Sequence, residues 1–281
     1  MSLAERDAVP ILVLESGRAE RNYWVDLWRY RELFLILAWR DIAVRYKQTV
    51  IGVAWAAIRP FLTMVVFAVI FGRIAQLPSD GAVPYALMVL AGILPWTFFS
   101  TALGDASNSL VNSAGLIGKV YFPRMIVPCT AIIVSVVDLL ISFVILALTL
   151  IWFHYLPDWR ILFLPFFVLL AFLAALGPAL WVTAINVKYR DFRYIIAFII
   201  QFGLYISPVG FSSQVVPEEW RLVYSINPLV GIIDGFRWCI LSGASQIYWP
   251  GFAISILAVS FTLWMGIRQF RKMERTFADL I

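Results

Sequence analysis

Six apolar stretches run through this chain, and their lengths restrict the fold more than any other feature. A helix rises about 1.5 Å per residue, so roughly 20 apolar residues cross the hydrocarbon layer of a membrane. The stretches lie at approximately Ala56–Gln76, Tyr85–Leu110, Met125–Phe153, Ile161–Val187, Arg193–Ser207 and Tyr248–Arg268. The fifth is too short to cross alone. The pattern predicts an all-α integral membrane protein with six transmembrane helices within residues 53–268.

The low share of charged residues excludes a soluble domain. Hydrophobic residues make up 62% of the chain and charged residues 14%, whereas a soluble domain carries about 25% charged residues. The net charge of +5 reflects basic loops between apolar stretches, and no nucleic-acid partner is expected. If both termini are cytoplasmic, 18 of the 22 Lys and Arg residues fall on cytoplasmic segments. This bias predicts that orientation.

The two terminal segments are interpreted as cytoplasmic, at residues 1–27 and 269–281. The first 25 residues contain four acidic side chains and no long apolar run, so we expect no cleavable signal peptide. Cys129 and Cys239 fall in segments near opposite faces of the membrane. We therefore expect no disulfide between them.

The stretch Trp28–Pro60 joins a basic helical pattern directly to the first apolar run. Its cations alternate with aliphatic side chains and tryptophans, and include Arg40, Arg45 and Lys47. The pattern predicts an amphipathic helix over residues 28–52 that lies at the bilayer surface. Asp41 and Arg45 stand four residues apart, a spacing at which they can pair along one face of the helix. The alternative is an ordinary basic segment that only fixes the orientation of the chain.

One string within this stretch carries a family resemblance. It reads Arg40-Asp41-x-x-x-Arg45-Tyr46-Lys47-Gln48-Thr49-x-x-Gly52-x-x-Trp55 and is closed by Pro60. It resembles the start of the membrane subunits of ABC-2 type polysaccharide exporters, which move O-antigen, capsule or teichoic acid chains across the bacterial plasma membrane. The segment layout extends the resemblance over nearly the whole chain. It implies a lipid-linked polysaccharide as cargo. Six spans do not easily enclose a wide pore, so we expect a homodimer. The residues assigned to lipid headgroups are Arg40, Asp41, Arg45, Tyr46 and Lys47; the cations among them suit the pyrophosphate of a lipid carrier, and anionic phospholipid alone is the alternative.

The chain lacks the sequence motifs of an energy-coupling enzyme. It contains no GxxxxGK[ST] phosphate loop and no HExxH, CxxC or GxSxG motif. Its single histidine, His154, lies beside Tyr155 near the end of the third span, where an interfacial role is favoured over a metal site. We expect no cofactor on this chain. Energy for transport would come from a separate ATP-binding cassette subunit that holds ATP and Mg²⁺.

Two cytoplasmic loops are candidate docking sites for that ATPase. The loop at Asn108–Pro128 predicts a short helix broken by glycines, and it resembles the coupling helix of the exporter family. The loop at Asn186–Tyr194 combines three cations with three aromatic rings. A plain turn, and cations placed only by membrane orientation, are the alternatives. The residues assigned to coupling are Gly115, Lys119, Tyr189, Arg190 and Asp191.

The region from Pro208 to Gly243 predicts re-entrant helices between the fifth and sixth spans. Its apolar pieces are short and are interrupted by proline and glycine. Broken backbone at membrane depth needs shielding by protein or a water-filled cavity. The exporter family has gate helices here, which assigns Pro208, Asn227 and Pro228 to an outer gate. A wet amphipathic loop is the alternative.

Aromatic rings and one acidic residue deep in the spans complete the candidates. Aromatic faces suit a conduit for a sugar polymer, although helix packing accounts for these rings equally well; the rings are Trp96, Phe98, Phe99, Tyr205 and Phe211. Asp138 lies near the middle of the third span. No Lys, Arg, His or Glu is predicted at its depth, so we expect a hydrogen bond from Ser, Tyr or backbone.

Two other functions remain open on sequence alone. An ABC-2 exporter of a lipid or drug would share the architecture. A membrane enzyme acting on lipid-linked sugars would need an external loop rich in carboxylates or histidine. The outer segments offer only Glu218, Glu219 and Asp234 around the broken region, which favours the exporter.

Overall fold

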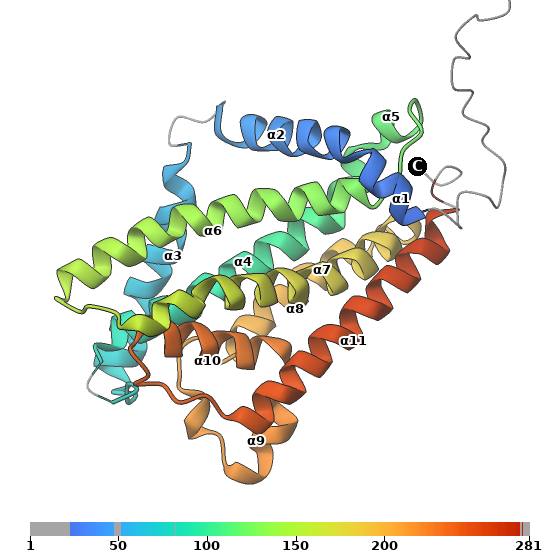
Figure 1. Ribbon diagram of the computed structural model, residues 1–281. Coiled ribbons are helices and arrows are strands. Elements are labelled where there is room, and N and C mark those ends of the chain that lie inside the picture. The colour runs from blue at the N-terminus through green and yellow to red at the C-terminus, as the bar shows by residue number, and fades with distance from the viewer. Residues whose placement is uncertain (1–22, 48–51, 82, 276, 278–281) are drawn as a thin grey trace, which may run out of the picture.

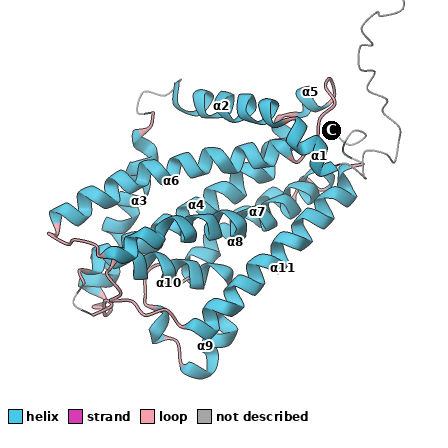
Figure 2. Cartoon of the chain, viewed as in Figure 1, coloured by secondary structure: helices cyan, strands magenta, loops and turns pink. Residues whose placement is uncertain are grey.

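The computed structural model describes residues 23–47, 52–81, 83–275 and 277, and these residues form helices and connecting turns with no strand (Figures 1 and 2). The helices are α1 (Tyr23–Arg29), α2 (Arg31–Lys47), α3 (Ala54–Phe67) continued by the π-helical η2 (Ala68–Ile74), α4 (Tyr85–Asn112), α5 (Ala114–Ile117), α6 (Ile126–Trp152), the 3-10 helix η3 (Trp159–Phe163), α7 (Leu164–Lys188), α8 (Phe192–Ile206), the 3-10 turn η4 (Ser213–Val215), α9 (Glu218–Tyr224), α10 (Pro228–Ile240) and α11 (Trp249–Glu274).

Five helical segments of the described chain are long and apolar enough to cross a membrane. They are α3 with η2, α4, α6, η3 with α7, and α11. Their limits agree with the apolar stretches of the sequence to within a few residues, except that α11 runs on to Glu274. The predicted fifth span forms as α8, but its 15 residues fall short of the roughly 20 needed to cross. The prediction of six transmembrane helices is therefore supported for five, and the predicted fifth span is short, as its sequence indicated.

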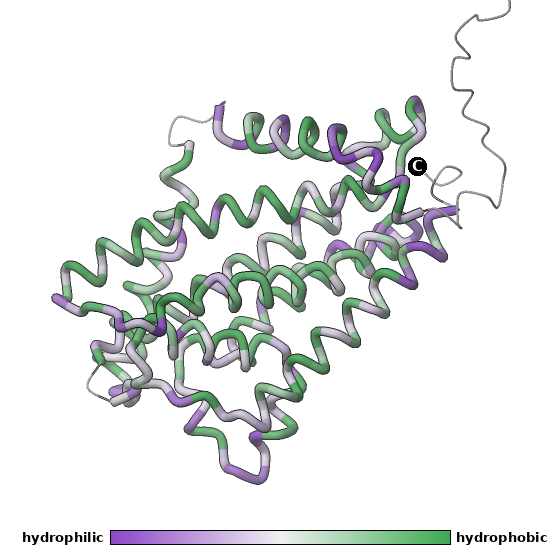
Figure 3. Tube along the Cα trace, in the orientation of Figure 1, coloured by the Kyte–Doolittle hydropathy of each residue, from purple (hydrophilic) through white to green (hydrophobic). Residues whose placement is uncertain are grey.

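Helix α4 forms the centre of the molecule. In its most apolar 18-residue window, 72% of the residues are buried, against 17% in the α3–η2 segment. It packs against α6 and α7, and α7 packs in turn along α11 (Figure 1). Helices α3 and α8 lie at the edge and leave apolar side chains such as Val66 and Phe198 exposed. Apolar residues colour most of the long helices in Figure 3, as expected for surfaces that face lipid.

The contact between α7 and α11 depends on two glycines. A Cβ atom at Gly177 would lie 2.6 Å from the backbone nitrogen of Leu263, and one at Gly266 would collide with the carbonyl of Gly177. Small residues allow membrane helices to approach this closely, which increases their van der Waals contact.

Proline and asparagine mark where several helices begin. α7, α10 and α11 each carry a proline within the first two positions, where a missing amide hydrogen costs nothing and the fixed φ suits a helix. Asn227 caps α10, because its side chain accepts a hydrogen bond from the amide of Leu229 at 3.1 Å.

The molecule has two ends that carry different elements. We call them the α5 end, which holds α1, α5 and the C-terminal part of α11, and the α9 end, which holds α9 and the start of α11 (Figure 1). The predicted boundary at residue 28 differs from the structure, where helix already begins at Tyr23. Residues 1–22 and 48–51, including Gln48 and Thr49 of the family-like string, lie outside the described residues.

Candidate functional site

Helix α2 packs along the first half of α6 in the same chain direction. The Thr130 hydroxyl donates to Asp41 Oδ2 at 3.4 Å, and further along both helices the Tyr46 hydroxyl donates to Asp138. Burial, together with the adjacent Asp138 carboxylate, raises the pKa of Tyr46, so the hydroxyl remains a proton donor. The predicted interface helix is therefore anchored to the transmembrane bundle along its length.

Arg45 joins this helix to two transmembrane helices at once. Its Nη1 lies 3.0 Å from Asp105 Oδ2 on α4 and 3.2 Å from Asp138 Oδ2 on α6. The pairing of Arg45 with Asp41 that their spacing allows does not form, because Asp41 accepts from Arg40 at 2.8 and 2.9 Å instead. Two carboxylates together attract the guanidinium more strongly than the single carboxylate of Asp41, which already pairs with Arg40. We call Arg45, Tyr46, Asp105 and Asp138 the α2 latch.

The structure also corrects the expected surroundings of Asp138. The predicted hydrogen bond from a tyrosine is confirmed by Tyr46. The expectation that no cation lies at its depth is wrong, since Arg45 reaches it. α2 brings that cation beside the middle of α6, a contact between residues far apart in sequence. The signal that pointed to it was Asp138 itself, a carboxylate too costly to leave unpaired in a span.

A groove of about 640 Å³ opens between α2, α4 and α6 beside the latch. Arg40, Asp41, Arg45 and Asp105 all line it. Both guanidinium groups are paired with carboxylates, so an anionic headgroup would compete with Asp105 and Asp138 for Arg45. Lys47 is exposed and has no ion pair with any described residue. Of the three cations among the residues assigned to the headgroup, it is therefore the one most available to an anion.

The two predicted docking loops lie together at the α5 end. The side chain of Asn186, near the end of α7, donates to the carbonyl of Ser107 on α4 at 2.8 Å. This hydrogen bond joins α4 and α7, the helices that precede the two loops. Gly115 in α5 is exposed, and so is Lys119. The other three residues assigned to coupling, Tyr189, Arg190 and Asp191, also face outward. The structure therefore presents all five on its surface; their docking role stays a prediction.

A further set of contacts at the α5 end was missed by sequence reasoning. The backbone amide of Arg124, just before α6, donates to Glu274 Oε1 at 2.7 Å, and its guanidinium donates to the Glu274 carbonyl at 2.6 Å. The guanidinium of Arg271 lies 4.9 Å from the centre of the Tyr23 ring. The end of α11 is thus tied both to the loop after α5 and to α1. These side chains lie in three distant segments, and no local pattern relates them.

At the α9 end, the two proline motifs assigned to the outer gate meet. The Asn227 amide donates to Ser207 Oγ at 3.1 Å, which joins the segment before Pro208 to the start of α10 at Pro228. Helix α10 lies between α4, α7 and α11 and is buried along nearly all of its 13 residues. After α10, the carbonyl of Leu241 accepts from Tyr155 at 2.8 Å, so both ends of α10 contact loops at the α9 end.

Arg237 on α10 is fully buried and was not identified from sequence. Its guanidinium donates to the carbonyls of Val209 and Phe211, each at 2.9 Å, and of Met88 at 3.2 Å. Gly92 leaves room for it, since a Cβ atom there would lie 3.0 Å from Nη2. A buried arginine needs such partners. The available signal was a single arginine within a short apolar helix. We missed it because Arg237 was counted among the cations of the outer segments.

The five candidate conduit aromatics do not share one surface. Trp96 and Phe98 are buried in the core of the single chain. The Trp96 indole lies against Gly203 of α8, where a Cβ atom would sit 2.5 Å from Cη2. Phe99 and Phe211 are half-buried and Tyr205 is exposed. In this chain, helix packing accounts for Trp96 and Phe98.

Comparisons with known proteins agree with this arrangement. The chain is 23% identical over 260 residues to the O-antigen export system permease protein RfbA of Myxococcus xanthus, covering 91% of this chain and 98% of that protein. It is also 23% identical over 259 residues to the protein of the same name from Klebsiella pneumoniae, covering 89% and 95%. Residues 32–241 match the family described as ABC-2 type transporter, which confirms the resemblance of the opening string. The chain therefore belongs to the ABC-2 type transporter family.

Proposed function

We propose that this chain is the membrane subunit of an ATP-driven exporter of a lipid-linked polysaccharide of the O-antigen type. One observation carries the proposal: the similarity to O-antigen export permeases extends over 98% of the length of such a protein. Family membership and five membrane-length helices make the chain a multi-pass membrane protein and a transporter subunit rather than an enzyme. The cargo is inferred from the relatives' names.

The energy would come from a separate ATPase subunit that binds ATP and Mg²⁺. We place its docking surface at the α5 end. It comprises Gly115 on α5, Lys119 just after α5, and the loop at Tyr189–Asp191. The exposed Tyr189 ring packs beside Phe192, with ring centres 6.3 Å apart, and under the Lys188 ammonium. Exposed aromatic rings among cations are typical of protein interfaces. The ties from this end to α4 and α11 provide a rigid path for motion of a docked subunit.

In the bacterial plasma membrane, both termini and the α5 end would face the cytoplasm, as the distribution of Lys and Arg favours. The exposed rings of Trp24, Trp28 and Trp39 would anchor α1 and α2 among membrane lipids, and Lys47 would meet phosphate headgroups. Helix α10 would form a re-entrant element, with Pro208, Asn227 and Pro228 at an outer gate.

A second copy of the chain would complete the conduit across a two-fold axis. Helices α3 and α8 support this proposal, because they leave their apolar outer faces uncovered in the single chain. Tyr205 is exposed on α8 and is the conduit aromatic best placed to face such a partner.

Copurification tests the assignment. The chain, tagged and extracted from native membranes in mild detergent, should retain an ATP-binding cassette subunit in stoichiometric amount. Tyr189→Ala with Arg190→Ala should reduce the amount of that subunit at least about tenfold, since tyrosine and arginine are enriched among the interface residues whose truncation costs about 2 kcal/mol or more. Trp152→Ala with Arg73→Ala changes an exposed aromatic residue and an exposed arginine that have no proposed role, and it should not reduce the amount of that subunit. A wild-type chain that emerges alone from several detergents would refute the proposal.

A further inference from the structure

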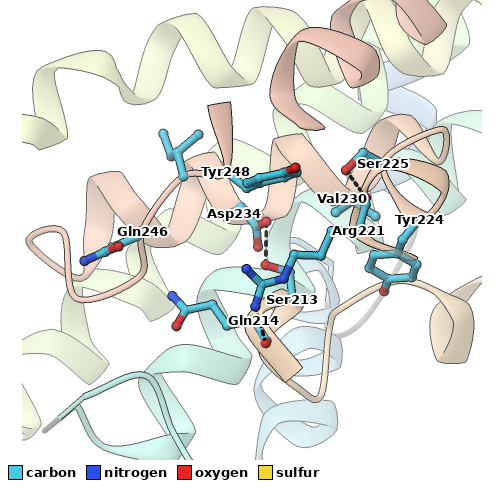
Figure 4. Close-up of a pocket in the computed structure, with 10 residues that line it drawn as sticks. Ser213, Gln214, Arg221, Tyr224, Ser225, Val230, Asp234, Gln246 and Tyr248 are labelled. Carbon is cyan, nitrogen blue, oxygen red and sulfur yellow. Dashed lines mark hydrogen bonds between the residues drawn. The ribbon is translucent and has the colours of Figure 1, made fainter. Parts of the chain in front are cut away.

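A polar pocket of about 180 Å³ lies at the α9 end, away from the proposed docking surface. It is formed by η4, α9, the first half of α10 and the segment that leads into α11. Its volume far exceeds the roughly 15 Å³ that one water molecule requires. Figure 4 shows side chains from these four elements around one space, with Gln246 at its outer edge.

The inner wall of the pocket contains a buried carboxylate with spare hydrogen-bonding capacity. Asp234 on α10 is 6% exposed. Within the described chain its side chain receives one hydrogen bond, from Ser213 Oγ to Oδ2 at 2.7 Å (Figure 4). The neighbouring Arg237 directs its guanidinium to backbone carbonyls instead. A carboxylate accepts several hydrogen bonds, so Asp234 offers acceptor positions to a ligand.

The opposite wall provides donors and further acceptors. Gln214 and Gln246 have exposed side-chain amides that make no hydrogen bond to any described residue. Arg221 uses Nε and Nη2 for the carbonyls of Val216 and Gln214 at 2.9 and 2.7 Å, and its Nη1 remains available. The Tyr248 ring forms part of the lining and is 36% exposed.

These groups suit a neutral polyhydroxylated ligand. Two amides, one carboxylate and one guanidinium can bind hydroxyl groups both as donors and as acceptors, and an aromatic ring can cover the apolar face of a sugar ring. The buried Asp234 carboxylate disfavours an anionic group such as a phosphate. We propose that this pocket binds one neutral glycosyl unit of the exported polymer at the α9 end. This inference rests on the proposed export function and goes beyond it by naming a glycan-binding site.

Saturation-transfer NMR on the full-length protein in lipid nanodiscs tests the site. The probes are maltotriose, mannotriose and tri-N-acetylchitotriose, with glycerol 3-phosphate as an anionic comparison. Saturation transfer to at least one trisaccharide is expected for the wild-type protein. Gln214→Ala and Gln246→Ala change exposed side chains. Each should weaken the affinity for the trisaccharide, measured by titration of the saturation-transfer signal, about fivefold to tenfold, as expected for loss of one ligand hydrogen bond. Asp234→Asn should weaken it as well.

Gln201→Ala is the matched control, because it removes an exposed glutamine on α8 outside the pocket. Absence of saturation transfer to all three trisaccharides in the wild-type protein would overturn the inference. Saturation transfer in Gln214→Ala and Gln246→Ala as strong as in the wild-type protein would also overturn it. Stronger binding of glycerol 3-phosphate would identify a headgroup site and also overturn it. Copurification of the ATPase with the wild-type protein and the pocket variants is measured in parallel. If the ATPase copurifies but no trisaccharide binds, the glycan site is wrong and the export proposal stands.

Discussion

One guanidinium group ties α2 to two transmembrane helices at once. Arg45 balances Asp105 and Asp138, whose side chains are 44% and 19% exposed, so its removal leaves two carboxylates facing each other in a partly dry site. We expect Arg45→Gln to lower the free energy of unfolding by about 1–3 kcal/mol, between the effects of exposed and buried pairs. Thermal unfolding in detergent measures it.

Two further variants make this prediction specific. Adding Asp105→Asn to Arg45→Gln removes one uncompensated charge and should restore part of the stability. Arg40→Gln breaks an exposed pair between adjacent residues and should cost less than about 1 kcal/mol. Equal losses in Arg40→Gln and Arg45→Gln would show that the latch contributes no more than a surface contact.

The buried Arg237 makes a second prediction at the scale of one residue. Arg237→Met retains apolar bulk but leaves the carbonyls of Val209 and Phe211 without their donor, and each unsatisfied buried group costs about 1–3 kcal/mol. We expect a total loss of about 2–5 kcal/mol and a reduced yield of monodisperse protein by size-exclusion chromatography. Arg73→Met, at an exposed arginine, should have little effect. A variant as stable as wild type would mean that water satisfies these carbonyls.

At the scale of elements, the contact between α7 and α11 can be tested directly. Gly177→Ala would place a methyl group against the backbone of α11, so the helices must separate and lose contact along their length. We expect a marked fall in the unfolding temperature. Gly104→Ala is the matched control, because its Cβ would meet only Ile200 Cδ1 at an ordinary 3.7 Å. That change should be neutral or stabilise the helix by up to about 1 kcal/mol. Similar effects of both substitutions would contradict close packing at Gly177.

Elements were predictable where local composition decides them. The apolar stretches identified five long helices, since a run of about 20 apolar residues has few alternatives to crossing a membrane, and proline with Asn227 identified the broken region before α11. Pairings were not predictable. Arg45 pairs with Asp105 and Asp138, 60 and 93 residues away, and not with the nearby Asp41. Arg237 donates hydrogen bonds to carbonyls from two other segments. Such contacts depend on how the helices pack, which a single sequence does not specify.

At the scale of the whole molecule, the two ends have different chemistry. The α5 end presents Lys119, Tyr189 and Arg190 on its surface, whereas the α9 end carries exposed Glu218 and Glu219 on α9 and the polar pocket around Asp234. Five apolar helices lie between them. An exporter needs this division, because energy enters at one face and cargo leaves at the other. The anchored α2 and the tie between Arg124 and Glu274 link the α5 end to the helices that reach the α9 end.

This polarity predicts the orientation of the chain. In a background with Cys129→Ala and Cys239→Ala, Glu218→Cys should react with a membrane-impermeant maleimide in cells with a permeabilised outer membrane. Lys119→Cys should react only after the inner membrane is opened. The physical reason is that cations concentrate at the α5 end, and basic loops remain cytoplasmic during insertion. Both positions are exposed, so a lack of reaction reports the membrane barrier rather than burial. The reverse labelling pattern would place the proposed docking surface outside the cell and exclude ATPase coupling there.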